Sequence, residues 1–521
     1  MTPRSALPTA LAVLALAGFA APPALAQDDT LRVRLNADIR STDPGVNRDG
    51  NTDMVAYHLF EGLVAYGQDT GIVPMLAEGY EVSDDGTVYT FRLRDGVTFH
   101  NGAALTAGDV VFAWDRFLNP DTGWRCLPDF DGRGVSRVTG VEAVDDLTVR
   151  FTLEEPAALF LTSMARVDCG VSGIWHRDSL DADGEWTQPI GTGPYRLAEW
   201  RQGQFIELEK FADYAALSGG LDGLAGNKSE GPERVRFVLI PDSSATRAAL
   251  QSGAIDLVAD MDDRDAEELS ARDGIELRSA ATLGVSGMLF QTRDPLLSDV
   301  RLRRAIVHAL DLEAMVEALG GDWVTYNPSP IPQISGFHAE IQSQGYTHDI
   351  AAAQALLAEA GYNGEEIVIV TNQRYRSMYE MAVMSQAMLE AIGVNARFEV
   401  MDWATQLDRY VDGNYMMQAF SFSARYDPGL SFDMFSGDKD EQPRKVWENP
   451  EALDLIQQAL STLDPEVRQP LFDQLHVMMI EDVPAIWLYN PSALAVFGPR
   501  VAAYEPWATT AARIWSVRMA E

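Results

Sequence analysis

Polar and apolar side chains alternate along several short stretches of the chain, the pattern of strands with one buried face. Residues 89–93 show this alternation, and residues 147–153 and 235–239 repeat it. Residues 367–370 are instead a continuous apolar run, which predicts a parallel strand buried on both faces. The pattern therefore predicts at least one sheet with a single buried face and one parallel sheet buried on both faces.

Apolar residues at helical spacing predict helices between these strands. The spacing predicts one helix over residues 301–319, ended by the glycine pair at 320–321. Asp349 can cap a second helix, with Gly361 as its stop, and a third is expected over residues 378–391. Strands that alternate with helices in this way predict α/β lobes with parallel or mixed sheets.

The first 26 residues have the pattern of a cleavable secretory signal. Arg4 precedes an almost wholly apolar stretch over residues 6–21. Ala24-Leu25-Ala26 then fits the A-x-A cleavage pattern, so Gln27 is the expected mature start. The apolar stretch is short for a membrane span, and the cleavage site has no nearby cysteine to carry a lipid. We therefore expect an exported chain that is free in its compartment.

Size and charge narrow the function classes. The chain has 521 residues, which predicts two or three domains. Its formal net charge of −37 opposes binding to nucleic acid and to anionic lipid. In an exported protein, the pair Cys126 and Cys169 indicates one disulfide, with two buried free thiols as the alternative.

Motifs for catalysis or metal binding are missing from the sequence. It contains no HExxH, no GxSxG and no GxxxxGK[ST]. His58, His308 and His476 fall in predicted helices, where we expect surface or packing roles. The carboxylates between Asp260 and Glu268 lack the glycine of a calcium loop, so a solvated helix start is the better interpretation. We predict no catalytic residue, no metal and no cofactor.

Several segments, in order along the chain, carry a resemblance to a known family. They are STDP at 41–44, FEGLV at 60–64, DGTVYTFRLRDGVTFHNG at 85–102, LTAGDVVFAW at 105–114, IGTGPY at 190–195, DVRLRRAI at 299–306 and LLAEAGY at 356–362. These segments resemble the extracytoplasmic solute-binding protein family 5, whose members bind peptides, opines or nickel complexes for ABC importers.

The resemblance implies an α/β, two-lobed periplasmic binding protein with a hinge and an extra small domain inserted in the first lobe. We expect lobe I to comprise residues 27–75, 188–285 and 495–521, the inserted subdomain 76–187, and lobe II 286–494. The expected function is that of a monomeric periplasmic receptor, not an enzyme, which captures a small solute between its lobes and delivers it to the membrane permease. The alternatives are import of a nickel chelate or haem, or a periplasmic enzyme or sensor on the same scaffold.

The family's cleft-lining stretches give the expected ligand contacts. By resemblance they are Asn47, Arg48, Trp124, Arg374, Tyr375, Arg376, Trp403, Phe422, Ser423 and Arg425. Peptide-binding members place an Asp three residues before the position of Asp427, where it pairs with the peptide ammonium, but Ala424 stands there in this chain.

That departure and the arginines among these positions point to the charge of the ligand. Because guanidinium groups pair with carboxylate or phosphate in a bidentate manner, convergence of Arg48, Arg374, Arg376 and Arg425 predicts a small anionic or zwitterionic ligand. An opine, a modified peptide or a sugar acid would fit. The alternative for each arginine is an ordinary surface or ion-paired position.

Overall fold

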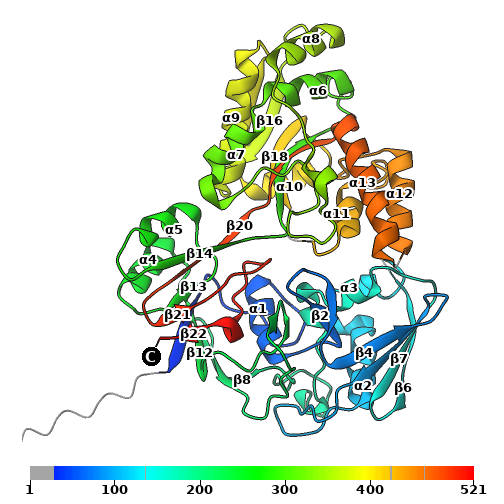
Figure 1. Ribbon diagram of the computed structural model, residues 1–521, viewed down its shortest axis with the longest axis vertical. Coiled ribbons are helices and arrows are strands. Elements are labelled where there is room, and N and C mark those ends of the chain that lie inside the picture. Colours follow the sequence, from blue (N-terminus) through cyan, green and yellow to red (C-terminus); the bar gives the residue numbers. More distant parts are fainter. Residues whose placement is uncertain (1–28, 135, 423–424, 463, 521) are drawn as a thin grey trace, which may run out of the picture.

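Three sheets of four or more strands organise the described part of this computed structural model, residues 29–520 without 135, 423–424 and 463. A seven-stranded and a four-stranded sheet lie in the lower half of Figure 1, and a five-stranded sheet lies in the upper half. We call the lower part lobe I and the upper part lobe II. The predicted signal segment and two positions of the candidate site, Ser423 and Ala424, lie outside the described residues.

The seven-stranded sheet forms the centre of lobe I. Its strands, in spatial order, are β14 (Glu276–Ala281), β20 (Ser492–Phe497), β13 (Leu257–Val258), β1 (Thr30–Leu35), β12 (Arg234–Leu239), β9 (Phe205–Lys210) and β8 (Tyr195–Arg201). β1 pairs in parallel with β12 and β13, and the other pairings in this sheet are antiparallel. The strand predicted over residues 235–239 is thus confirmed as β12.

The helices α1 (Gly50–Leu59), α4 (Ser243–Gln251) and α5 (Asp263–Ser270) belong to the same lobe. Each begins at an aspartate whose side chain accepts a backbone N–H, as for Asp49 with Thr52. The short strands of lobe I are β2 (Val64–Tyr66), β3 (Ile72–Pro74), β10 (Leu221–Asp222), β11 (Ala225–Gly226), β21 (Val501–Ala503) and β22 (Arg518–Met519).

The four-stranded antiparallel sheet is inserted in lobe I. Its order is β4 (Ala77–Val82), β5 (Val88–Leu93), β7 (Thr148–Leu153) and β6 (Val138–Asp145), and α2 (Ala107–Phe117) packs against β6 and β7. Tyr89, Phe91 and Leu93 all point into the core, which confirms the strand predicted from their alternation. The short helix α3 (Phe160–Met164) follows. One buried apolar cluster joins this sheet to the seven-stranded one, so the two share a core.

Lobe II is built on the five-stranded sheet, in the order β17 (Ala396–Met401), β16 (Ile367–Asn372), β18 (Met417–Phe422), β15 (Val285–Phe290) and β19 (Ala485–Tyr489). β16 pairs in parallel with both neighbours, as its continuous apolar run predicts. The surrounding helices are α6 (Val300–Ala309), α7 (Leu312–Gly320), α8 (Ile350–Ala360), α9 (Arg376–Ala391), α10 (Trp403–Val411), α11 (Pro428–Phe435), α12 (Pro450–Ser461) and α13 (Pro465–Asp482).

One helix prediction in lobe II is wrong. The single helix expected over residues 301–319 is two helices, because Leu310 is extended and Asp311 caps α7 through a bond from the Ala314 N–H to its carboxylate (3.1 Å). The helix expected after Asp349 is confirmed as α8, with Gly361 in the left-handed conformation at its end.

Two short links join the lobes, at residues 282–284 and 490–491. They run side by side. The Thr282 N–H and hydroxyl both donate to the Pro491 carbonyl (2.9 and 2.6 Å), and the Asn490 amide donates to the Gly284 carbonyl (2.8 Å). Lobe II is therefore one continuous segment of chain attached through a paired hinge.

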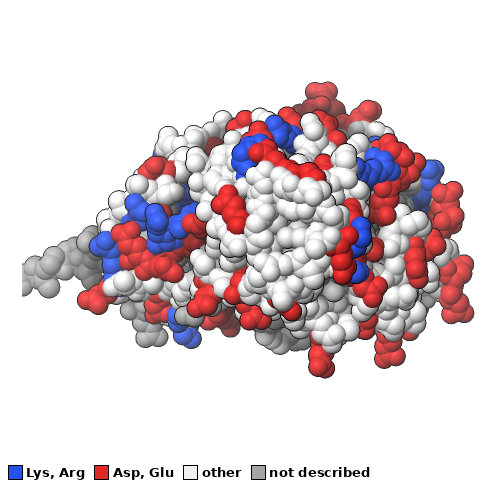
Figure 2. All heavy atoms as spheres, turned by 90° about the horizontal axis from the view of Figure 1, so that it is seen from above, with Lys and Arg blue, Asp and Glu red and all other residues white. Residues whose placement is uncertain are grey.

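Seen from above, most carboxylates lie around the margin of the molecule with lysines and arginines in small groups among them, and the centre of this face has few charged side chains (Figure 2). On this face the negative charge is dispersed rather than gathered in one patch. The acidic run predicted to begin a helix does so, because Asp262 caps α5 in lobe I. In the described part of the chain, no helix is long and apolar enough to cross a membrane.

Candidate functional site

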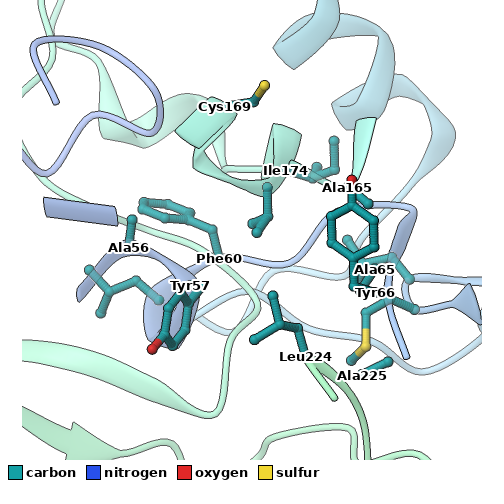
Figure 3. Close-up of a cluster of buried hydrophobic side chains, with 14 of the residues drawn as sticks. Ala56, Tyr57, Phe60, Ala65, Tyr66, Ala165, Cys169, Ile174, Leu224 and Ala225 are labelled. Atoms are coloured by element: carbon teal, nitrogen blue, oxygen red, sulfur yellow. The ribbon is translucent and has the colours of Figure 1, made fainter. Parts of the chain in front are cut away.

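The lobes touch on the side where α3 approaches α12 (Figure 1). There the Ala158 N–H of lobe I donates to the Leu460 carbonyl of lobe II (3.2 Å). Tyr426, just before α11, stacks on Tyr66 of lobe I with ring centroids 3.6 Å apart and planes 9° apart. Tyr66 is itself part of a buried cluster that also holds Ala165 and Cys169 (Figure 3). The contact between the lobes is therefore anchored in the core of lobe I.

A cavity of about 610 Å³ opens at this junction and is walled by both lobes. Its cationic side chains outnumber its carboxylates. The cations are Arg133 and Arg166 of lobe I and Arg425, Arg444 and Lys445 of lobe II, and the carboxylates are Asp129, Glu155 and Asp433. Leucines of both lobes and Met434 add apolar surface. Such a lining suits a small solute with negative charge and some apolar surface.

Arg166 is held in place by two carboxylates of lobe I. Its Nε and Nη2 donate to Asp168 (3.0 and 2.7 Å), and its Nη1 pairs with Asp129. Burial opposes ionisation of Asp168, but Arg166 and then Arg125 and Arg48 hold the pKa of this carboxyl below its usual value. Asp168 therefore stays charged and fixes the orientation of the Arg166 guanidinium group.

Arg48 and Arg425 share this electrostatic neighbourhood. Burial lowers the pKa of both guanidinium groups, Arg125 and Arg166 lower it further, and Asp168 raises it. Arg48 also donates to Asp53 (2.9 Å), and Nη2 of Arg425 lies 3.2 Å from the Met434 sulfur. Arg166 alone is in contact with Asp168 among the described contacts, and the charges of Arg48, Arg125 and Arg425 interact with the same carboxylate over a longer range.

The disulfide explains how the loops of lobe I reach this place. Cys126 and Cys169 are bonded, which confirms the predicted pairing. The Trp124 indole donates to the Cys169 carbonyl (3.0 Å), and the Arg125 N–H donates to the Gly45 carbonyl (2.9 Å). A side chain at Gly45 would put its Cβ 2.5 Å from the indole nitrogen, so this close approach requires glycine. The crosslink therefore holds three loops together.

Some of the predicted contacts lie at this junction and others in the cores. Arg425 lines the cavity at the junction. Arg48 is paired with Asp53 of α1 in lobe I, and Asn47 beside it donates to the Arg40 carbonyl (3.4 Å). Trp124 is buried and stacks on neighbouring phenylalanines, with a centroid distance of 4.6 Å to that of Phe117. Phe422, at the end of β18, is also buried.

The remaining predicted residues lie together near the hinge. The Trp403 and Tyr375 rings meet edge to face at 4.9 Å, and the Arg374 guanidinium lies 5.6 Å from the centre of the Tyr375 ring. Arg376 pairs with Glu380 (2.6 Å). A separate cavity of about 260 Å³ lies between residues 374–377 and the start of α5. The four arginines expected to converge thus do not all line one cavity. Arg425 lines the cavity at the lobe junction, whereas Arg374 and Arg376 line the cavity near the hinge.

Sequence patterns do not single out Arg166, Asp168 or Asp129, because these residues lie on irregular loops outside the recognisable motifs. One signal was present, since all three lie within three residues of a cysteine in the predicted disulfide. In the described part of the chain, Cys126, Asp129 and Cys169 form one cluster of metal-ligand types. Both sulfur atoms are bonded to each other in the disulfide, so this cluster contains no thiolate that could bind a metal.

Comparison with known proteins gives consistent matches. Residues 71–442 match the family described as bacterial extracellular solute-binding proteins, family 5 middle. Heme-binding protein A of Haemophilus influenzae is 29% identical over 464 residues, covering 84% of this chain and 82% of its own. The dipeptide-binding protein of Escherichia coli is 29% identical over 444 residues, 80% of each chain. The solved structure of HbpA2 from Haemophilus parasuis has a TM-score of 0.81 at 25% identity, covering 94% of this chain and all of that one.

Proposed function

Because the chain belongs to family 5 of the bacterial extracellular solute-binding proteins, we propose that its solute is small, anionic or zwitterionic, and bound by arginines at the lobe junction. The family and the two-lobed fold predicted from the sequence motifs are confirmed. The protein is the substrate-binding component of an ABC importer. What remains to be proposed is the chemistry of its solute.

The observation that carries the proposal is the excess of positive charge where the lobes meet. The cavity at the junction is lined by five cationic side chains, Arg133, Arg166, Arg425, Arg444 and Lys445. The carboxylates that line it are three, Asp129, Glu155 and Asp433. No ion pair joins Arg125 to a carboxylate within the described residues. A solute carboxylate or phosphate would supply the missing negative charge through bidentate hydrogen bonds.

The sequence before α11 supports the same chemistry. Residues 423–426 read Ser-Ala-Arg-Tyr, without the Asp that peptide-binding members use for the peptide ammonium. An unmodified dipeptide would bring its ammonium next to Arg425, and like charges there would weaken binding. A blocked or modified peptide, an opine or a sugar acid avoids this cost.

Haem is the second candidate, because one of the similar proteins is named for haem binding. Haem carries propionate carboxylates, which the same arginines would pair with. We further propose that the mature chain begins at Gln27 and acts in the periplasm as a monomer. There it would pass its solute to the permease without catalysing a reaction.

A binding screen of the purified mature protein tests the proposal. Thermal shift and calorimetry would compare unmodified dipeptides, N-acetylated dipeptides, glutathione, agropinic acid, sugar acids and haem. We expect a hit among the anions that weakens at least about tenfold in Arg425→Ala, the equivalent of ~1.4 kcal/mol. Arg150→Ala removes an exposed arginine paired with Glu142 away from the junction and should bind as the unmodified protein does. Tight binding of an unmodified dipeptide, unchanged in Arg425→Ala, would contradict the proposal.

A further inference from the structure

Lysine is rare in this chain, and three of its four lysines lie at buried positions. Of the 40 lysine and arginine residues, only Lys210, Lys228, Lys439 and Lys445 are lysines. Lys210 and Lys228 each pair with a glutamate. Lys439 and Lys445 are each 4% exposed, and within the described residues neither ammonium forms an ion pair. A buried ammonium without a counter-charge is costly, so its partners deserve close inspection.

Lys439 forms part of the wall of a cavity of about 530 Å³ in lobe II, which we call the distal cavity. Its Nζ donates to the Gln291 side-chain carbonyl (2.8 Å) and to the Thr292 hydroxyl (2.7 Å), which are both neutral acceptors. An ammonium has three N–H groups, so these bonds leave one donor over. Burial lowers the pKa of the Lys439 ammonium to about 8, although the charge of Glu448 opposes this shift. The charged form therefore lacks stabilisation that a bound anion supplies.

The other charged groups of this wall are paired, bonded to the backbone or exposed. They are Arg293, Arg409, Asp294, Glu399 and Asp412. Both arginines are held in ion pairs (2.6 and 3.3 Å). Asp294 accepts two backbone N–H groups, and Asp412 is exposed to water. Within the described residues, Lys439 is thus the buried charge of the distal cavity that has no charged partner in contact with it.

A second hydrogen-bond donor lies on the buried part of the wall. Tyr415 is 7% exposed, and its hydroxyl is buried without a hydrogen-bond partner in the described part of the chain. Gln291 links Lys439 to the loop that carries this tyrosine, because its Nε2 donates to the Gly413 carbonyl (2.7 Å) and its N–H to the Met416 carbonyl (2.8 Å). An oxyanion accepts hydrogen bonds from ammonium and hydroxyl donors alike.

The distal cavity is separate from the cavity at the lobe junction. The two cavities have no lining residue in common. Glu448, which holds Arg293 at the distal cavity, lies just before the start of α12, and Leu460 near the end of this helix lines the junction cavity. The 12 residues of α12 span about 18 Å. An ion in one cavity therefore does not touch the residues of the other.

We propose that the distal cavity is a second binding site, which takes a small oxyanion, a carboxylate or a phosphate, through the Lys439 ammonium. The bound ion accepts hydrogen bonds from the third N–H of Lys439 and from the Tyr415 hydroxyl, and it supplies the counter-charge that the ammonium lacks. This site goes beyond the proposed function, because it uses none of the residues that line the junction cavity.

NMR of the lysine side chains tests this site, because four lysines give few signals. The mature protein, labelled with ¹³C at lysine Cε, is titrated with sodium phosphate and then with sodium acetate at constant ionic strength. We expect one signal, absent from Lys439→Gln, to shift until the site is saturated, and its titration midpoint to rise by about one pH unit. Lys439→Arg, which keeps the positive charge, assigns this signal if the glutamine variant does not fold.

Three variants complete the test. Tyr415→Phe removes only the hydroxyl and should weaken anion binding at Lys439 at least about threefold. Lys210→Gln, the matched control, removes a lysine of lobe I paired with Glu233 (3.6 Å) and should leave the Lys439 response unchanged. Arg425→Ala alters the junction cavity and should also leave it unchanged. An ion bound at the junction is instead expected to move the Lys445 signal, since Lys445 lines that cavity.

Two results would overturn the second site. One is a Lys439 signal that does not respond to either anion at about 10 mM, well above a millimolar Kd. The other is a response that disappears in Arg425→Ala, because the ion then lies at the junction. Neither result bears on the solute screen, and a screen without a hit leaves the response of Lys439 standing.

Discussion

Replacing Cys126 and Cys169 with alanine removes the crosslink between two loops that carry Arg125 and Arg166. The bond spans a sequence separation of 43 residues. Loop-closure entropy for a ring of this size corresponds to about 4 kcal/mol at 25 °C. Both residues are at most 1% exposed, so the lost sulfur atoms also leave unfilled space, which adds on the order of 1 kcal/mol. We therefore expect a loss of about 4–5 kcal/mol in the free energy of unfolding.

Urea unfolding followed by tryptophan fluorescence measures this loss. The buried Trp124 donates to the Cys169 carbonyl, and the buried Trp114 packs against Trp124, so their emission reports the unfolding of the region around the bond. That transition should be fitted by itself, because a chain with two lobes need not unfold in one step. The double-alanine variant should also bind any anionic solute more weakly, since the loops bearing Arg125 and Arg166 lose their common anchor.

Reductant gives the control. In native buffer it should react slowly with the buried bond, and at urea concentrations within the transition it should bring the unmodified protein to the curve of the variant. A difference in unfolding free energy below about 1 kcal/mol, with the bond intact at the start, would refute the reasoning from loop closure.

Two further predictions concern buried charge in lobe I. Lys228→Met leaves Glu61, now 2.7 Å from the Lys228 ammonium, buried without its partner, and should lower the free energy of unfolding by about 3–5 kcal/mol. Lys210→Met, which breaks a looser and more exposed pair, should cost far less, and equal losses in urea unfolding would contradict this view. Burial lowers the pKa of His58 from 6.5 to about 3, so the unfolded chain binds the proton more readily between these values. Stability should be complete above pH 6.5 and fall by about 2 kcal/mol at pH 5. His58→Gln should flatten this part of the stability–pH profile, and an unchanged slope would exclude His58 as its cause.

The pattern of polar and apolar residues predicts those helices and strands in which buried and exposed side chains follow a regular period. The alternation in β5 and the continuous run in β16 report which faces are covered, and both strands are where the patterns place them. The sequence does not predict the break between α6 and α7, because the apolar spacing of a helix continues through Leu310. Asp311 is compatible both with a solvent-facing position inside one helix and with the cap of a second helix. A cap competes with helix continuation, and spacing alone does not decide between them.

The candidate site was predicted less completely, for a different reason. Arg48 and Arg425 are 377 positions apart in sequence, and their neighbourhood depends on how the lobes meet. Resemblance to the family placed both near the cleft. It gave no account of Arg166, whose loop position is set by the disulfide and by Asp168. Which arginines face each other is thus a property of the tertiary arrangement, which one-dimensional periodicity does not record.

The paired links of the hinge make lobe II an exchangeable cassette. The segment from β15 to β19 leaves and rejoins lobe I at neighbouring points, so one recombination event replaces it without cutting the core of lobe I. Such an exchange carries Arg425 and Tyr426 away together and leaves Arg48, Arg125 and Arg166 behind. A new solute preference then arises when the lobe I residues of the site face a lobe II from another protein. The chimaeras that bind solute are those in which the charges of the two lobes are complementary at the junction.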